Sequence, residues 1–176
     1  MYDAHYGAVL AYALRRTANA EDAGDVVSEV FLTAWRRIDA VPGGEAARLW
    51  LYGTARRVIA NQTRAMRRQK RLSERLGREP SHSPLAGDTA EPGAASAAFA
   101  ALSAEDRDLL GLVAWEGLSH REVAAVLGCS VNAAKLRAHR ARRRFAASLA
   151  ERGATRPRRT SLRASDPQVA QAPAEG

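Results

Sequence analysis

The sequence predicts an all-α protein with two small helical domains, a flexible linker between them and a disordered C-terminal tail. Only 6% of the 176 residues are aromatic, alanine is abundant, and valine and isoleucine are sparse, a composition that favours helices over strands. Residues 79–98 are rich in proline, glycine and small side chains and contain no lysine or arginine, which is typical of a linker. The domains are therefore expected at 1–78 and 99–150, with the tail at 151–176.

The first domain is expected to begin with two helices. Apolar residues recur at helical spacing within residues 2–18: Tyr2, Tyr6, Val9, Leu10 and Leu14. Asn19 is a suitable N-cap for a second helix over 20–38, whose first turn carries acidic residues that the helix dipole favours. The apolar stripe of this second helix is expected to face the core: Val26, Val27, Val30, Phe31, Ala34, Trp35 and Ile38.

The opposite side of the second helix is polar and carries Asp22, Asp25, Ser28 and Glu29. Carboxylates at this spacing can bind a metal ion, but no histidine accompanies them three residues further along the helix. We therefore interpret this side as a solvated or partner-binding face, and we expect neither a metal ion nor another cofactor.

A long third helix is predicted over 45–75, after the break at Val41-Pro42-Gly43-Gly44. The apolar side of this helix is followed by a basic run: nine basic residues and a single acid lie from Arg56 to Arg78. Trp50 and Tyr52 lie just before this run, and aromatic rings beside arginines suit the binding of unstacked bases. Core packing is the alternative, and for at least one of the two rings it is the better interpretation.

The second domain is predicted to contain a helix-turn-helix packed on a supporting helix. Ser103 caps the supporting helix, whose apolar residues are Leu109, Leu110, Leu112, Val113 and Trp115. Ser119 and Glu122 have the spacing of a capping box for the next helix, and Gly128 ends that helix. A three-residue turn, Gly128-Cys129-Ser130, then leads into the last helix.

The last helix combines a narrow apolar edge with a strongly basic surface. Ser130 is its expected N-cap, and the apolar edge consists of Val131, Ala134, Ala138 and Ala141. Six fixed positive charges and no acid lie from Lys135 to Arg144, whereas a merely solvated helix usually mixes both signs. A helix-turn-helix with a basic second helix fits the major groove of DNA. The net charge of +8, supplied almost entirely by arginine, also indicates a polyanionic partner.

Other features exclude several classes of protein. The single cysteine, Cys129, excludes an internal disulfide and a cysteine-rich zinc site. No apolar run approaches the ~20 residues that span a bilayer, and the first residues lack the positive charge of a signal peptide. We therefore expect a cytoplasmic protein without membrane insertion.

Three segments together resemble the extracytoplasmic-function (group IV) sigma factors of bacterial RNA polymerase. They are DAGDVVSEVFLTAWRRI, ARLWLYGTARRVIANQTRAMRRQKR and LSAEDRDLLGLVAWEGLSHREVAAVLGCSVNAAKLRAHRARRRF, and the resemblance covers nearly all of residues 2–149. It implies a sigma region 2 helical bundle and a sigma region 4 helix-turn-helix that direct promoter recognition, DNA opening and transcription initiation without enzymatic activity. The implied partners are core RNA polymerase, through its beta-prime clamp helices and beta flap, promoter DNA and, as in many members, an anti-sigma protein.

The resemblance also assigns roles to individual residues. Polymerase binding falls to Asp25, Ser28 and Glu29, where members usually have glutamine in place of Ser28. Recognition of the minus-ten element falls to the Val41–Glu45 loop and to Trp50, Arg56, Arg57, Asn61, Arg64, Arg67 and Arg68; members often have asparagine in place of Arg57. Recognition of the minus-thirty-five element falls to Lys135, Leu136, Arg137, His139, Arg140, Arg142 and Arg143.

Two other classes of function explain less of the sequence. A stand-alone DNA-binding regulator would use only the helix-turn-helix and would leave the basic run at 56–78 without a role. A nuclease or recombinase needs a nucleophile or a metal cluster, but the four histidines (His5, His82, His120 and His139) are scattered and the only cysteine lies in a turn.

Overall fold

The computed structural model describes residues 1–75 and 93–154, and all regular elements in these ranges are helical. The helices are α1 (Tyr2–Leu14), α2 (Ala20–Arg36), the short 3-10 helix η1 (Ile38–Ala40), α3 (Glu45–Arg75), α4 (Ala94–Ala100), α5 (Ala104–Ala114), α6 (His120–Leu127) and α7 (Val131–Ala154). This confirms the predicted all-α class. Most of the predicted linker and the predicted tail from residue 155 onward lie outside the described residues.

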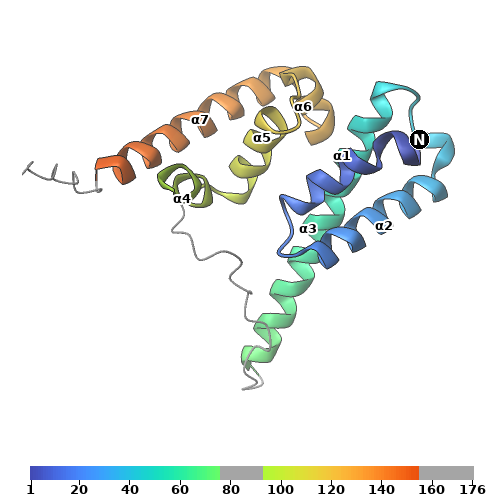
Figure 1. The fold of residues 1–176 in the computed structure, drawn as a ribbon, viewed down its shortest axis with the longest axis horizontal. Coiled ribbons are helices and arrows are strands. Elements are labelled where there is room, and N and C mark those ends of the chain that lie inside the picture. The colour runs from blue at the N-terminus through green and yellow to red at the C-terminus, as the bar shows by residue number, and fades with distance from the viewer. Residues whose placement is uncertain (76–92, 155–176) are drawn as a thin grey trace, which may run out of the picture.

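The first domain is a bundle of α1, α2 and α3, in which each helix packs on the other two (Figure 1). Its core contains Val9, Tyr12, Val26, Val30 and Leu51, all fully buried. α2 begins as predicted, because the Asn19 side-chain oxygen accepts a hydrogen bond from the Asp22 backbone N–H at 2.7 Å. The second half of α3 projects beyond the other helices (Figure 1).

The prediction for the C-terminal end of the α2 stripe is wrong. Trp35 is 78% exposed and Ile38 is 53% exposed, so neither belongs to the core. The buried face of α2 is instead centred on Val26, Val30 and Ala34. Since each residue turns the helix by about 100°, Trp35, nine residues after Val26, lies on the opposite side.

The second domain consists of α4, α5 and α6 packed against the long helix α7 (Figure 1). Its buried side chains include Leu109, Leu112 and Val123, together with the predicted alanine edge of α7. Helix α4 lies partly within the predicted linker, because the run of alanines from Ala94 has high helix propensity. Phe99 fixes α4 on α7 through an edge contact with Phe145, with ring centroids 6.4 Å apart.

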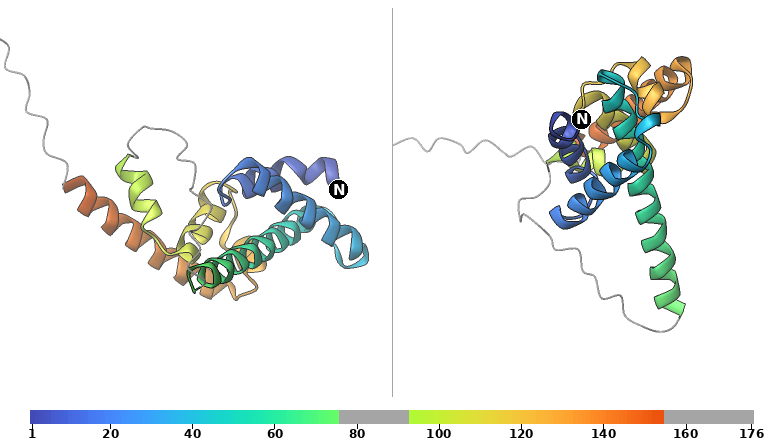
Figure 2. Two further views of the ribbon diagram at one scale, coloured as in Figure 1. Left: turned by 90° about the horizontal axis from the view of Figure 1, so that it is seen from below. Right: turned by 90° about the vertical axis from the view of Figure 1, so that its right-hand side faces the viewer.

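The two domains also contact each other. Helix α3 of the first domain packs against α6 of the second (Figure 2), and the Val126 carbonyl oxygen would lie 3.4 Å from a Cβ placed on Gly53. Arg15 and Arg16, which directly follow α1, and side chains of α3 also form ion pairs with the second domain. Within the described ranges, no helix is long and apolar enough to cross a membrane.

Candidate nucleic-acid interface

The helix-turn-helix formed by α6 and α7 is held by local hydrogen bonds that the sequence predicted. The Ser119 hydroxyl accepts a hydrogen bond from the Glu122 N–H at 3.3 Å, and the Glu122 carboxylate accepts one from the Ser119 N–H at 2.8 Å. These bonds with Ser119 lower the pKa of the Glu122 carboxyl group. Gly128 ends α6 with a left-handed φ of 64°, and the Ser130 hydroxyl caps α7 by accepting from the Ala133 N–H at 3.2 Å.

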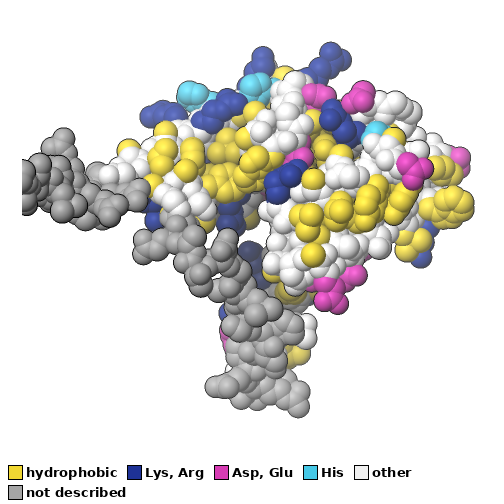
Figure 3. Space-filling view, in the orientation of Figure 1, with side chains coloured by type: hydrophobic (Ala, Val, Ile, Leu, Met, Phe, Trp, Pro, Cys, Tyr) yellow, Lys and Arg dark blue, Asp and Glu magenta, His cyan; other side chains and the backbone are white. Residues whose placement is uncertain are grey.

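Helix α7 has one buried edge and one exposed basic surface. The methyl groups of Ala134, Ala138 and Ala141 are completely buried, and their small size lets α7 lie close to the helices beneath it. Lysine, arginine and histidine side chains gather along the outer edge of α7 (Figure 3). The structure exposes every side chain that we assigned to the minus-thirty-five element: Lys135, Leu136, Arg137, His139, Arg140, Arg142 and Arg143.

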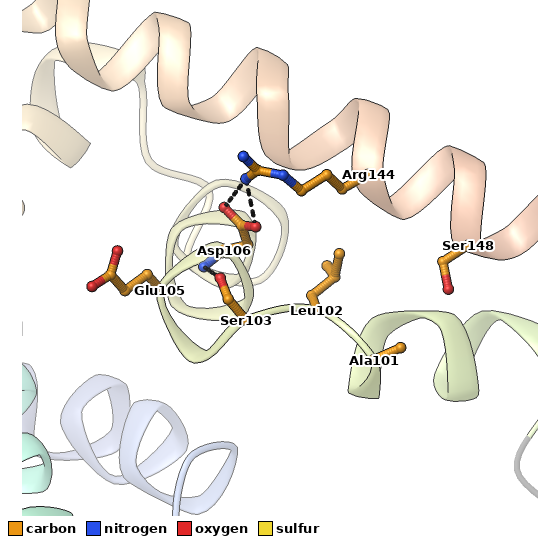
Figure 4. A pocket seen from close by; sticks show the side chains of 7 residues that line it. All are labelled: Ala101, Leu102, Ser103, Glu105, Asp106, Arg144 and Ser148. Atoms are coloured by element: carbon orange, nitrogen blue, oxygen red, sulfur yellow. Dashed lines mark hydrogen bonds and ion pairs between the residues drawn. The ribbon is translucent and has the colours of Figure 1, made fainter.

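Arg144 differs from the other basic residues of α7. Its Nη1 lies 3.0 Å from Asp106 Oδ1 and 2.8 Å from Oδ2, so it joins α7 to the start of α5 (Figure 4). Both residues line a shallow hollow with Leu102 and Ser148. Because the Asp106 carboxylate is 13% exposed and lies directly against this guanidinium, Arg144 has a structural role within the second domain.

The residues assigned to the minus-ten element follow one side of α3, but their surroundings differ. Arg57 donates a hydrogen bond to the Thr54 hydroxyl at 3.0 Å, and Arg64 donates one to the Asn61 side chain at 2.7 Å. Arg67 and Arg68 are exposed on the projecting half of α3. Trp50, Arg56 and Arg57 instead line a cleft of about 400 Å³ between α3 and α6, together with Leu49, Val126 and Leu127.

Tyr52 belongs to the core and not to this surface. Its ring stacks on Tyr12 with centroids 5.2 Å apart, and burial raises the pKa of its hydroxyl. This confirms that core packing accounts for one of the two aromatic residues that precede the basic run. Trp50 is half-buried and remains at the cleft.

The polar side of α2 is exposed at Asp25, Ser28 and Glu29, as predicted. Trp35 lies seven residues after Ser28, which is about two turns, so it extends the same face. Leu32, 47% exposed, lies between them. This face therefore joins an acidic end to an exposed apolar end, and the spacing from Ser28 is the sequence signal that would have identified Trp35.

Two further acidic residues, Asp108 and Glu116, escaped the sequence analysis although both accept several hydrogen bonds from the first domain. The Asp108 carboxylate accepts hydrogen bonds from Tyr12 Oη at 3.1 Å, Arg16 Nε at 3.0 Å and Arg56 Nε at 2.7 Å. Burial, followed by the nearby Asp108 charge, raises the pKa of the Tyr12 hydroxyl. In residues 1–75 and 93–154, no group of three or more His, Cys, Asp or Glu side chains could hold a metal ion.

Both halves of the chain match known families. Residues 1–71 match the family model of Sigma-70 region 2, and residues 93–145 match that of Sigma-70 region 4. The chain is 32% identical over 163 residues to the ECF RNA polymerase sigma factor SigL of Mycobacterium tuberculosis, a match that covers 89% of this chain and 90% of the relative. The chain belongs to the ECF sigma factors. It therefore directs promoter recognition and transcription initiation by RNA polymerase.

Other comparisons agree with this membership. The sigma factor is also 32% identical to the ECF RNA polymerase sigma factor EcfG of Rhodopseudomonas palustris, over 82% of this chain and 80% of that protein. CnrH, solved in complex with the cytosolic domain of CnrY, has 27% identity and a TM-score of 0.58, over 85% of each chain. The sigma factor RpoE, solved with the anti-sigma factor NepR from Bartonella quintana, shares the fold with a TM-score of 0.62 at 24% identity, over 85% of this chain and 94% of that chain.

Proposed function

We propose that this sigma factor uses three separate surfaces for its three tasks: the α2 face for polymerase, α7 for the minus-thirty-five element and α3 for the minus-ten element. The observation that carries the proposal is the basic surface of α7, whose seven assigned side chains are all exposed opposite a buried alanine edge. A helix with this division can enter the major groove without disturbing its own domain.

The minus-thirty-five element is read by α7. Arginine can form two parallel hydrogen bonds with the edge of a guanine, so Arg140 and its neighbours combine base contacts with phosphate contacts. Leu136 is 49% exposed on the same helix and offers an apolar contact for a thymine methyl group. The capped α6 and the turn at Gly128 position the first residues of α7 for this contact.

The minus-ten element is bound and opened by α3 and the Val41–Glu45 loop. Trp50 offers a flat ring to an extruded base, and Arg57, Asn61 and the exposed Arg64, Arg67 and Arg68 follow the DNA backbone. Extruding a base costs a few kcal/mol. Polymerase contacts and these side chains together supply that free energy.

Polymerase docks on the α2 face through its beta-prime clamp helices, while its beta flap holds the second domain. Asp25, Ser28 and Glu29 supply the polar part of the α2 contact. Trp35 supplies a large apolar anchor two turns further along. The shorter Ser28 side chain, where the family usually has glutamine, leaves more of this contact to Trp35.

The sigma factor acts in the cytoplasm, catalyses no reaction of its own and is restrained by an anti-sigma protein. Support for the last point comes from its relatives, since RpoE and CnrH were solved with NepR and with the cytosolic domain of CnrY.

A run-off transcription assay with core polymerase and a promoter pool tests this function. The wild-type chain should produce transcripts, and the double variant Asp25→Lys with Glu29→Lys should produce none because its docking face now carries the opposite charge. A matched double reversal at the exposed Asp3 and Glu105 should leave transcription intact. Full transcription by the docking variant would contradict the assignment of the α2 face, and tight promoter-specific binding without polymerase would favour the stand-alone regulator.

A further inference from the structure

The interface between the two domains combines apolar packing of α3 against α6 with a set of paired charges. Three arginines from the first domain, Arg15, Arg16 and Arg56, form the arginine cluster, and two carboxylates from the second domain, Asp108 and Glu116, form the acidic pair. Glu116 accepts from Arg15 Nη2 at 2.7 Å and from Arg16 Nη1 at 3.1 Å. The Glu116 side chain is only 3% exposed, but Arg15 and Arg56 are 32% and 38% exposed, so salt ions reach the arginine side of these charge pairs.

This interface covers part of the surface proposed for the minus-ten element. Arg56 Nε is held by Asp108, so this N–H is not available to a DNA phosphate. Trp50 and Arg57 face α6 across the cleft, where Val126 and Leu127 form the opposite wall. With α6 in this position Trp50 is half-buried, and a single strand has less access to this end of α3. The basic surface of α7, in contrast, stays exposed.

The charged part of this interface is imperfectly matched. Domains within one chain usually move relative to each other unless a large hydrophobic interface joins them. Arg16 illustrates the imperfect fit: its guanidinium lies 3.6 Å above the Tyr12 ring, yet its Nη2 is buried without a hydrogen-bond partner. A Cβ on Gly111 would lie only 2.9 Å from that atom, so Gly111 is needed for the close approach.

The acidic pair presents to the arginine cluster the same kind of ligand that DNA does. Carboxylates and phosphates are both anions that accept charge-assisted hydrogen bonds from guanidinium groups. Binding of DNA to Arg56 therefore requires that Asp108 release it. The second domain therefore competes with the minus-ten strand for Arg56. Because both domains belong to one chain, this competitor is always close to the site.

We propose that the free sigma factor is autoinhibited by its own second domain. In this closed conformation the acidic pair holds the arginine cluster, and α6 covers the Trp50 end of the minus-ten surface. High salt, promoter DNA or polymerase opens the conformation by weakening or replacing the charge pairs. The covering of a minus-ten surface rests on the function proposed above for α3, whereas the closed conformation itself does not.

Small-angle X-ray scattering of the full chain tests the closed conformation without polymerase or DNA. The radius of gyration of the wild type should increase between about 0.05 M and about 1 M salt, because the Debye length falls to about 3 Å over this range. The double variant Asp108→Asn with Glu116→Gln should already be extended at low salt. The matched neutralisation Asp3→Asn with Glu105→Gln changes the net charge equally at exposed positions and should stay compact.

A variant that keeps every charge guards against misfolding of the double variant. Gly53→Leu places a bulky side chain where even a Cβ would lie 3.4 Å from the Val126 carbonyl oxygen. It should separate α3 from α6 with unchanged helical circular dichroism. If the wild type is extended at low salt, or if both variants stay as compact as the wild type, the closed conformation is wrong.

The consequence for DNA is measured with a fluorescent pool of short single-stranded DNA at low salt. The apparent dissociation constant rises as the open fraction falls, so the Asp108→Asn, Glu116→Gln chain should bind at least about tenfold more tightly than the wild type. The matched control should change binding by less than about twofold. Equal binding by all three chains would overturn the autoinhibition.

The same measurements distinguish this inference from the function on which it rests. A chain that opens with salt but never supports run-off transcription would contradict the proposed function and leave the closed conformation standing. A chain that transcribes normally but is extended at low salt would contradict the autoinhibition alone.

Discussion

Replacing Arg144 and Arg140 separately by methionine should separate a structural arginine from a DNA-binding one on the same helix. Both substitutions remove one positive charge and leave an unbranched apolar side chain in place of the arginine. Arg144 lies against both oxygens of Asp106 at 2.8 and 3.0 Å, whereas Arg140 lies on the exposed side of α7. We therefore expect Arg144→Met to lower stability and Arg140→Met to lower DNA recognition.

The size of the stability effect follows from the exposure of the two partners. Arg144 is 59% exposed, so solvent screens the pair. Its contribution to stability should therefore be about 0.2–1 kcal/mol, the usual range for surface ion pairs. Asp106 is only 13% exposed and loses its cation, which moves the expected cost to about 1 kcal/mol. With a urea slope of about 2 kcal/mol per molar, the unfolding midpoint should fall by about 0.5 M.

Urea unfolding and competition binding to promoter DNA in the presence of polymerase measure the two effects. Arg140→Met should keep the free energy of unfolding within about 0.5 kcal/mol and lose about 1–3 kcal/mol of discrimination among upstream sequences if it contacts a base. In a double-mutant cycle, the variant that combines Asp106→Asn with Arg144→Met should lose less stability than the two single variants lose in sum. Loss of sequence discrimination in Arg144→Met with unchanged stability would refute the structural role.

Three further predictions follow from single side chains. Trp35→Ala should keep the free energy of unfolding within about 0.5 kcal/mol, because the ring is 78% exposed. It should weaken binding to core polymerase by about 2 kcal/mol, as expected for an aromatic anchor. Unchanged binding in a titration would remove Trp35 from the docking face. Gly128→Ala should cost about 1 kcal/mol or more in thermal or urea unfolding, because φ there is +64°; Gly43→Ala, with open space around its Cβ position and no left-handed φ, is the control. The lowered pKa of Glu122 adds stability that is fully present above the ordinary pKa of 4.5 and is lost as the pH falls through the lower pKa of the folded state. In Glu122→Gln, the free energy of unfolding measured from pH 7 to pH 3 should lack this part of the pH dependence. An unaltered pH profile in the variant would contradict the prediction.

The ends of the helices and the two faces of α7 could be predicted because they depend on neighbouring residues. Asn19, Ser119 and Ser130 act as caps through hydrogen bonds that span only three residues. The left-handed turn at Gly128 is equally local. The buried alanine edge of α7 follows from the helical period alone, so the basic side chains had to lie on the remaining surface.

Only the tertiary structure decided which partners these surfaces meet. The sequence placed Trp35 in the core because it lies about one turn after Phe31, and only the packing of α2 shows that the buried face is centred on the other side, at Val26, Val30 and Ala34. Arg56 and Asp108 are 52 residues apart, and Arg144 and Asp106 are 38 apart. No local rule connects such positions, because an ion pair depends on how whole helices pack; the structure therefore separates Arg56 and Arg144, which are held by carboxylates, from Arg140, which looked the same in the sequence.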